Sequence, residues 1–245
     1  MYKLVTGVLA LCLGTCAGQQ GAAQYDGCGP HGIGERLGGH AQTFVQGLKS
    51  VPREMFRPAN LKWELPVAAT TVILVKKGDT ETADAVKSRS LADRSSTATN
   101  VGLGVELASG AIAYGAGCWD GNSRLRETGF TSLTALGEAG LADLALKVAF
   151  DRQFPKGPGV HSTGDFRGGG RSFPSGHAMT SFAFASAVAH RYPEKRWVKW
   201  GAYGLATMVS ALRVPAKHHF PSDVIVGGAL GYAIGAYAAD HGPGH

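Results

Sequence analysis

The sequence predicts an all-α protein built as a single bundle of about six helices. Its apolar residues gather in stretches long enough for several helical turns, and almost nothing alternates apolar and polar residues as a half-buried strand would. One stretch carries leucine and valine at helical spacing, at Leu133, Leu136, Leu141, Leu144 and Val148. The expected helical stretches are residues 65–75, 101–118, 131–150, 178–189, 197–214 and 224–239, and the polar break at 76–94 is expected to be an exposed loop or a polar helix.

The first 60 residues are expected to lie outside this bundle. After Lys3, the run from Leu4 to Ala17 is apolar and short, which is typical of an export signal over residues 1–18. Residues 19–60 are rich in Gly, Gln and Pro without a helical or strand period, so we expect a linker or loosely structured arm there. The helical domain is then residues 61–240, and a chain of 245 residues is long enough for its core.

The cysteines give information about the cellular compartment in which the protein is expected to reside. Leu13-Gly-Thr-Cys16 is a loose match to a bacterial lipoprotein cleavage box, although Thr15 is unfavourable before the cysteine, so lipidation of Cys16 stays open. After processing, Cys28 and Cys118 would be the remaining thiols. An oxidising compartment would allow one bridge between them, and the sequence does not decide whether it forms.

Composition favours membrane association, whereas a mean hydropathy near zero favours the alternative, a compact soluble bundle in the periplasm. A membrane span needs about twenty mostly apolar residues, and the longest run in the domain without Asp, Glu, Lys, Arg or His is the sixteen residues 224–239. Charged residues interrupt the other candidates, at Glu106, Glu138, Asp143 and Lys199. Against this, only 17% of residues are charged, compared with about 25% in ordinary soluble domains. Small residues at 227–231 and at Gly235 suit close helix packing.

Two stretches near the C-terminal end, residues 171–177 and 213–223, carry the chemistry. The second contains adjacent histidines, of which His219 stands four residues before Asp223, one helical turn away, whereas His218 does not. A carboxylate bonded to one ring nitrogen fixes the tautomer and leaves the other nitrogen free to attack phosphorus. We therefore predict His219 as a nucleophile.

The first stretch predicts an anion site at a helix N-terminus. Pro174 can start the turn, Ser175 can cap the helix, and free backbone N–H groups would then face an anion. Gly176 lets the backbone approach a phosphoryl oxygen, and His177 could donate a proton to a departing alkoxide.

A third stretch runs from Lys147 to Pro155, where Pro155 restricts Phe154 and ends the helix. Taken in their order along the chain, the three stretches resemble the motifs of the superfamily of type 2 phosphatidic acid phosphatases and vanadium haloperoxidases. Within that superfamily the chain resembles a bacterial acid phosphatase-like member. The signature of that superfamily is K-x6-R-P, then P-S-G-H, then S-R-x5-H-x3-D, and the match spans residues 147 to 223.

The resemblance implies a role for each matching residue. Lys147 and Arg213 would bind phosphate oxygens, Ser175 and Gly176 would bind them through hydroxyl and backbone, and His177 would be the general acid. His219 would form a phosphohistidine, and Asp223 would orient it.

The chain departs from the signature at two positions. Leu212 stands in place of the serine, and Phe154 stands in place of the arginine before proline. Residues seven apart share a helix face, so the expected guanidinium is missing from the side that carries Lys147. Arg152 is our candidate for the missing phosphate contact, with Arg171 or Lys156 as further candidates.

The predicted function is metal-independent hydrolysis of phosphomonoesters, with lipid phosphates or diphosphates as the expected substrates. The net charge of +6 suits an anionic substrate or an anionic lipid surface, and the scattered cations do not suggest nucleic acid. No Asp, Cys or His cluster has the spacing of a zinc or two-metal site, so we expect no metal and no cofactor. We expect export to the cell envelope with the site on the periplasmic side.

Two alternatives stay open. A vanadate-dependent haloperoxidase could hold vanadate in the same pocket with His219 as its axial ligand. A non-catalytic envelope protein could use the pocket to bind phosphorylated lipid, and Phe154 is its best support. The sequence does not specify the leaving group or the oligomeric state.

Overall fold

The structure is a computed structural model that describes residues 28, 32–39, 42 and 45 and residues 58–241. These residues form helices and connecting segments, and no strand occurs among them, so the predicted all-α class is confirmed. The elements are α3 (Pro58–Ile73), the π-helical turn η1 (Leu74–Gly78), α4 (Asp79–Ala85), α5 (Arg89–Trp119), α6 (Ser123–Phe150), α7 (Gly176–Arg191), α8 (Arg196–Ala211) and α9 (Pro221–His241). The expected export signal at residues 1–18, with Cys16, lies outside the described residues.

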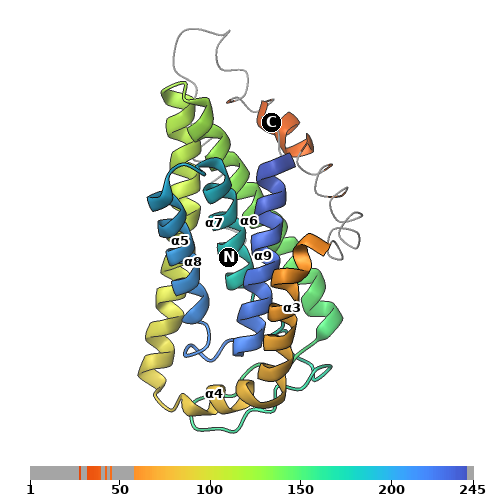
Figure 1. The fold of residues 1–245 in the computed structure, drawn as a ribbon. Helices are drawn as coiled ribbons and strands as arrows, with labels where there is room; N and C mark the ends of the chain where they lie inside the picture. The colour runs from red at the N-terminus through yellow and green to blue at the C-terminus, as the bar shows by residue number, and fades with distance from the viewer. Residues whose placement is uncertain (1–27, 29–31, 40–41, 43–44, 46–57, 242–245) are drawn as a thin grey trace.

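Helices α5 to α9 run side by side, and α4 lies across one end of them (Figure 1). The central helix α7 packs against α6, α8 and α9. At the end where α4 lies, α6 finishes, α7 begins, and α8 is followed by α9 (Figure 1). The fold therefore brings the three stretches that were predicted to carry the chemistry to one end of the bundle, which we call the site end.

The polar break at residues 76–94 is largely helical, in agreement with the polar helix that was one of its two expected forms. It contains the short helix α4 and the first turn of α5, because the Ser88 hydroxyl accepts a hydrogen bond from Leu91 N (3.3 Å) and caps a helix that starts well before residue 101. Asp79, the first residue of α4, is only 1% exposed. One acidic residue of this segment is thus part of the interior.

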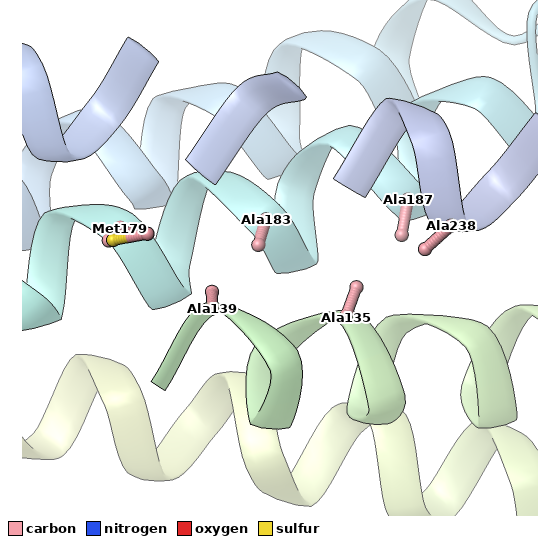
Figure 2. Packing of buried hydrophobic residues seen from close by; sticks show 6 residues of the cluster. All are labelled: Ala135, Ala139, Met179, Ala183, Ala187 and Ala238. Carbon is pink, nitrogen blue, oxygen red and sulfur yellow. The ribbon is translucent and has the colours of Figure 1, made fainter. Parts of the chain in front are cut away.

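The middle of the bundle is packed through small side chains. Alanines of α6 and α9 face Met179 and alanines of α7 (Figure 2). Along the contact between α7 and α9, a Cβ at Gly231 or Gly235 would lie 2.1 Å from the carbonyl oxygen of Met179 or Ala183, respectively. Glycine at these two positions allows the helices to approach at backbone distance.

A disulfide between Cys28 and Cys118 joins the arm to the C-terminal end of α5, with the Cα atoms 6.0 Å apart. Residues 32–39 are helical, and Arg36 of this helix forms an ion pair with Glu127 of α6. The described parts of the expected arm are therefore anchored to the bundle, at the end opposite the site end.

Within the part of the chain that the structure describes, two helices, α5 and α9, are long and apolar enough to cross a membrane by length and composition. Of the charged residues that interrupt the hydropathy of α5 and α6, Glu106 and Asp143 are buried and Glu138 is half-buried. Large apolar side chains lie exposed on the outer faces instead, among them Val101, Val105 and Ile112 of α5, Leu141 and Val148 of α6, and Trp200 of α8.

Candidate active site

His219 lies in the segment between α8 and α9 and is almost fully buried. Its Nδ1 lies 2.6 Å from the carbonyl oxygen of Ser172. A carbonyl oxygen can only accept, so Nδ1 donates, and in the neutral ring Nε2 is the nitrogen with a free lone pair. Burial lowers the pKa of His219 to about 4, and this outweighs the nearby carboxylate of Asp223, which raises it. The imidazole is therefore neutral near pH 7, as a nucleophile must be.

Asp223 was predicted to orient His219 directly, and the geometry assigns part of this task to the backbone. The nearer carboxylate oxygen lies 3.8 Å from Nδ1 of His219, beyond hydrogen-bond distance. That oxygen accepts hydrogen bonds from the Ser172 hydroxyl (2.5 Å) and from Phe220 N (2.9 Å). Asp223 thus holds Ser172, and the carbonyl of Ser172 holds the histidine ring.

Ser175 is the N-cap of α7, as predicted, but its hydroxyl makes no capping hydrogen bond. Its Oγ is buried and finds no partner among the described residues. Buried hydroxyls are rarely left without a partner, so this one is suited to receive a ligand. The amide of Ser175 donates to the carbonyl of Asp223 (3.0 Å), which fixes the α7 N-terminus beside α9.

Gly176 lies where the first turn of α7 packs against side chains of α6. A Cβ at this position would lie 2.6 Å from Oδ2 of Asp143 and 3.0 Å from Nζ of Lys147. The absence of a side chain therefore leaves room for the Lys147 ammonium next to the α7 N-terminus. Lys147 pairs with Asp143 at 2.6 Å.

Arg213 provides the second cation of the site. It is 6% exposed, and its Nη1 donates to the hydroxyl of Thr99 (3.1 Å). Its Nε has no partner among the described residues. Burial lowers the pKa of Arg213 to about 10, so it remains charged at neutral pH. A charged guanidinium with an unused N–H is a suitable donor for a phosphate oxygen.

His177, in the first turn of α7 and outside both candidate membrane spans, lies near this group. Its Nε2 is 3.1 Å from Oδ1 of Asn100 on α5. Burial, followed by the charge of Arg213, lowers the pKa of His177 to about 3. Arg213 and Lys147 act electrostatically on both histidines, so the two rings and the two cations belong to one site.

Arg152 does not fit the expectation of a phosphate contact. It is 1% exposed, and its guanidinium binds the carboxylates of Asp79 and Asp223. The reason is local, because α6 ends at Phe150 and Asp151 adopts a left-handed conformation (φ 46°). The chain therefore leaves the helix before Arg152, and its side chain no longer follows the face that carries Lys147.

Phe154, in place of the arginine of the signature, lies with its ring centroid 6.2 Å from that of His219. Sequence reasoning missed Asn100, Thr99, Asp143, Ser172 and Asp79 as neighbours of the site. Of these, only Asp143 could have been predicted from the sequence, because it stands one helical turn before Lys147. The partners Asn100 and Asp79 are 77 residues from His177 and 143 residues from Ser222, respectively, and no local pattern reveals them.

Comparisons with known proteins found one family model, one relative and one solved structure, and the family model covers both histidines of the site. The family described as PAP2 superfamily matches residues 129–240. A lipid A 1-phosphatase of Porphyromonas gingivalis is 33% identical over 81 residues, which cover 31% of this chain and 18% of that protein, so the chain matches less than a fifth of the relative's length. A crystal structure described as the first transmembrane PAP2 type phosphatidylglycerolphosphate phosphatase from Bacillus subtilis superposes with a TM-score of 0.47 at 21% identity, over 82% of this chain and 94% of that one.

Proposed function

Residues 129–240 identify the chain as a member of the PAP2 superfamily, and from this membership we propose that it is a phosphatase that hydrolyses phosphomonoesters through a phosphohistidine. The observation that carries the proposal is the neutral, buried His219. Its Nδ1–H is held by a backbone carbonyl, which leaves Nε2 free beside two cations.

The proposed reaction has two steps. In the first, Nε2 of His219 forms a bond to phosphorus while the bond from phosphorus to the ester oxygen breaks, and His177 gives its proton to that oxygen. In the second, water forms a bond to phosphorus, the bond to Nε2 breaks, and the proton of the water passes to His177. Each step exchanges one bond at phosphorus, and the proton returns to His177.

Stabilisation of the phosphoryl oxygens is assigned to four groups. Lys147 and Arg213 supply positive charge, and the Ser175 hydroxyl and the backbone at Gly176 supply hydrogen bonds at the N-terminus of α7. The Nε of Arg213 and the Oγ of Ser175, neither of which has a hydrogen-bond partner in the described part of the chain, support this assignment. Electrostatic stabilisation is the dominant contribution in phosphoryl transfer. Because these groups supply it, we propose a reaction that needs no metal.

We propose phosphorylated lipids as the substrate class and membrane association of the protein. An apolar pocket of about 550 Å³ lies between α3, α7, α8 and α9, with Trp63, Phe182 and Tyr232 in its wall. Its lining includes Ser210 and Val224, which stand close in sequence to Arg213 and Asp223 of the site. A pocket of this kind suits a hydrocarbon chain whose phosphate lies at the histidines. The relationship to a lipid A 1-phosphatase supports the same class.

The proposal is tested by turnover of a chromogenic phosphate ester in the presence of a chelator, with His219→Ala in parallel. We expect full activity in chelator and none above background for the variant. Equal rates for variant and parent would exclude His219 as the nucleophile. A panel of lipid phosphates and soluble esters, run with and without detergent, then tests the substrate class. Phosphate binding without turnover of any ester would favour the non-catalytic alternative.

A further inference from the structure

Arg152 occupies an interior position at the site end and has no free face toward a substrate. Its Nε donates to the carbonyl of Gly164 (3.0 Å), and its Nη1 donates to the hydroxyl of Ser222 (2.8 Å) and to Asp223. Its Nη2 donates to Asp79 (2.7 Å). The rings of Phe166 and Phe220 lie 4.7 and 4.4 Å from the guanidinium carbon. Every nitrogen of this side chain is therefore engaged by the protein.

Asp79 is the second unusual residue of this cluster. It belongs to α4, outside the segment that matches the PAP2 superfamily, and it is 1% exposed. One carboxylate oxygen accepts from Ser222 N (3.0 Å), and the other accepts from Arg152 and from the Ser222 hydroxyl. Asp79 thus binds the first turn of α9, where the helix dipole favours a negative charge.

Arg152 connects these groups to His219 by two routes. Through its side chain it binds Asp223, which accepts a hydrogen bond from the Ser172 hydroxyl. Through its backbone, the carbonyl of Arg152 accepts from Ser172 N at 2.9 Å. Both routes end at Ser172, and the carbonyl of Ser172 holds Nδ1 of His219.

The positive charge of Arg152 is needed because it is paired with two buried carboxylates. Asp79 and Asp223 are both buried and both bind Arg152, so they share one positive charge. A buried carboxylate without a cation is strongly unfavourable. Loss of the shared charge would therefore alter the position of Asp223 and, through Ser172, the orientation of the His219 ring.

We propose that Arg152 and Asp79 are positioning residues that fix the tautomer and orientation of His219, and that Arg152 is not a ligand of the phosphate. The kinetic part of this inference rests on the proposed phosphatase function. It also assigns a task to α4, since Asp79 links that helix to the nucleophile.

Kinetics separate positioning from phosphate binding. Asp79→Asn keeps the shape of the side chain but removes the charge and replaces one acceptor oxygen with a donor NH2. We expect Asp79→Asn and Arg152→Lys to lower kcat on the order of 10²-fold, as misplacement of a reacting group does. KM for a chromogenic ester and the inhibition constant of inorganic phosphate should stay at the values of the parent. A matched control is Arg124→Lys, which alters an Arg–Glu pair at the opposite end of the bundle and should leave both constants unchanged.

A second measurement does not depend on turnover. In protein labelled with ¹⁵N-histidine, the His219 signal, assigned by its loss in His219→Gln, should show a single neutral tautomer protonated on Nδ1. In Asp79→Asn and Arg152→Lys it should show a mixture of tautomers or broadening, while the Arg124→Lys spectrum matches that of the parent.

The outcomes are distinct. The inference holds if both variants lower kcat and change the His219 tautomer while the inhibition constant of inorganic phosphate stays unaltered. A higher inhibition constant of inorganic phosphate in Arg152→Lys would overturn the inference in favour of direct phosphate binding. An unchanged kcat and an unchanged His219 tautomer in Asp79→Asn would overturn it as well. If Arg152→Lys does not fold, Asp79→Asn decides. If the parent hydrolyses no ester, the proposed function fails, and the tautomer alone decides the inference.

Discussion

The two ends of the helix bundle are held together by different chemistry. At the site end, Asp79, Arg152 and Asp223 form a buried ion-pair cluster. At the opposite end, the disulfide between Cys28 and Cys118 ties the arm to α5, and an exposed ion pair joins Arg124 to Glu194. Buried ion pairs add little net stability because both charges lose water, whereas a disulfide stabilises by restricting the unfolded chain. The comparison suggests that one end is built for geometry and the other for stability.

The largest effect on stability is expected from breaking the disulfide. The double variant Cys28→Ser/Cys118→Ser opens a connection between residues that are 90 positions apart. In the chain-entropy treatment of cross-links, a loop of this size contributes about 4–5 kcal/mol to the free energy of unfolding. Chemical denaturation should show a loss of this order, while kcat of the remaining folded protein stays at the parent value. A large fall in kcat would show that the two ends are coupled.

The next largest effect is expected on catalysis, when Ser175 at the site end is changed, without loss of stability. Ser175→Ala removes a buried hydroxyl that has no partner among the described residues. We expect kcat/KM to fall on the order of 10²-fold, as for loss of one oxyanion donor, and the melting temperature to stay unchanged. The control is Ser132→Ala, another buried serine, whose hydroxyl donates to the carbonyl of Gly129 within α6. Unaltered kinetics in Ser175→Ala would remove this hydroxyl from the phosphate site.

A smaller, pH-dependent effect follows from the two histidines. In the empty site the pKa of His219 is lowered to about 4 and that of His177 to about 3, so both rings are neutral at pH 7. A bound phosphate brings negative charge, which favours the protonated ring and raises the pKa of His177. His177 must be protonated to act as the acid, so activity is lost as pH rises through its pKa. The alkaline limb of kcat should therefore lie at higher pH than that of kcat/KM, as two pH–rate profiles will show. Coincident limbs would contradict the assignment of His177.

The smallest effect is expected from the exposed ion pair. Glu194→Gln removes the partner of Arg124, whose guanidinium also lies over the ring of Tyr192. Water and salt screen such a pair, so neither the denaturation midpoint nor kcat should change measurably. A clear loss of stability would show that the opposite end depends on charge as well as on the disulfide.

Much of the fold could be predicted from the sequence because helical periodicity is a local signal. The six apolar stretches correspond to α3 and to α5 through α9, although α5 begins well before residue 101 because Ser88 caps it. The polar segment 76–94 could not be resolved in the same way. Its polar composition indicates exposure to solvent. Asp79 is nevertheless buried, because Arg152 from a distant stretch forms an ion pair with it.

The site was predictable where motif spacing specifies it. His219, His177, Arg213 and Lys147 lie within one electrostatic neighbourhood, as three short patterns indicated. That Arg152 contacts phosphate stays a prediction, and the observed partners of its guanidinium, Asp79 and Asp223, do not favour it. The sequence did not reveal these partners because they lie in distant stretches of the chain, and because α6 ends at the left-handed Asp151 before Arg152 is reached. The carbonyl of Ser172 could not be foreseen, because a backbone atom acquires its partner only through tertiary packing.

Direct detection of a phosphoryl group on His219 tests the central claim most directly. Protein mixed with excess phosphate ester, quenched within one turnover under alkaline conditions and digested, is expected to yield an acid-labile phosphoryl group on the peptide that contains residue 219. His219→Ala should yield none, and His177→Asn should retain it longer, since His177 assists its release. A phosphoryl group on another residue, or turnover in its complete absence, would contradict the account.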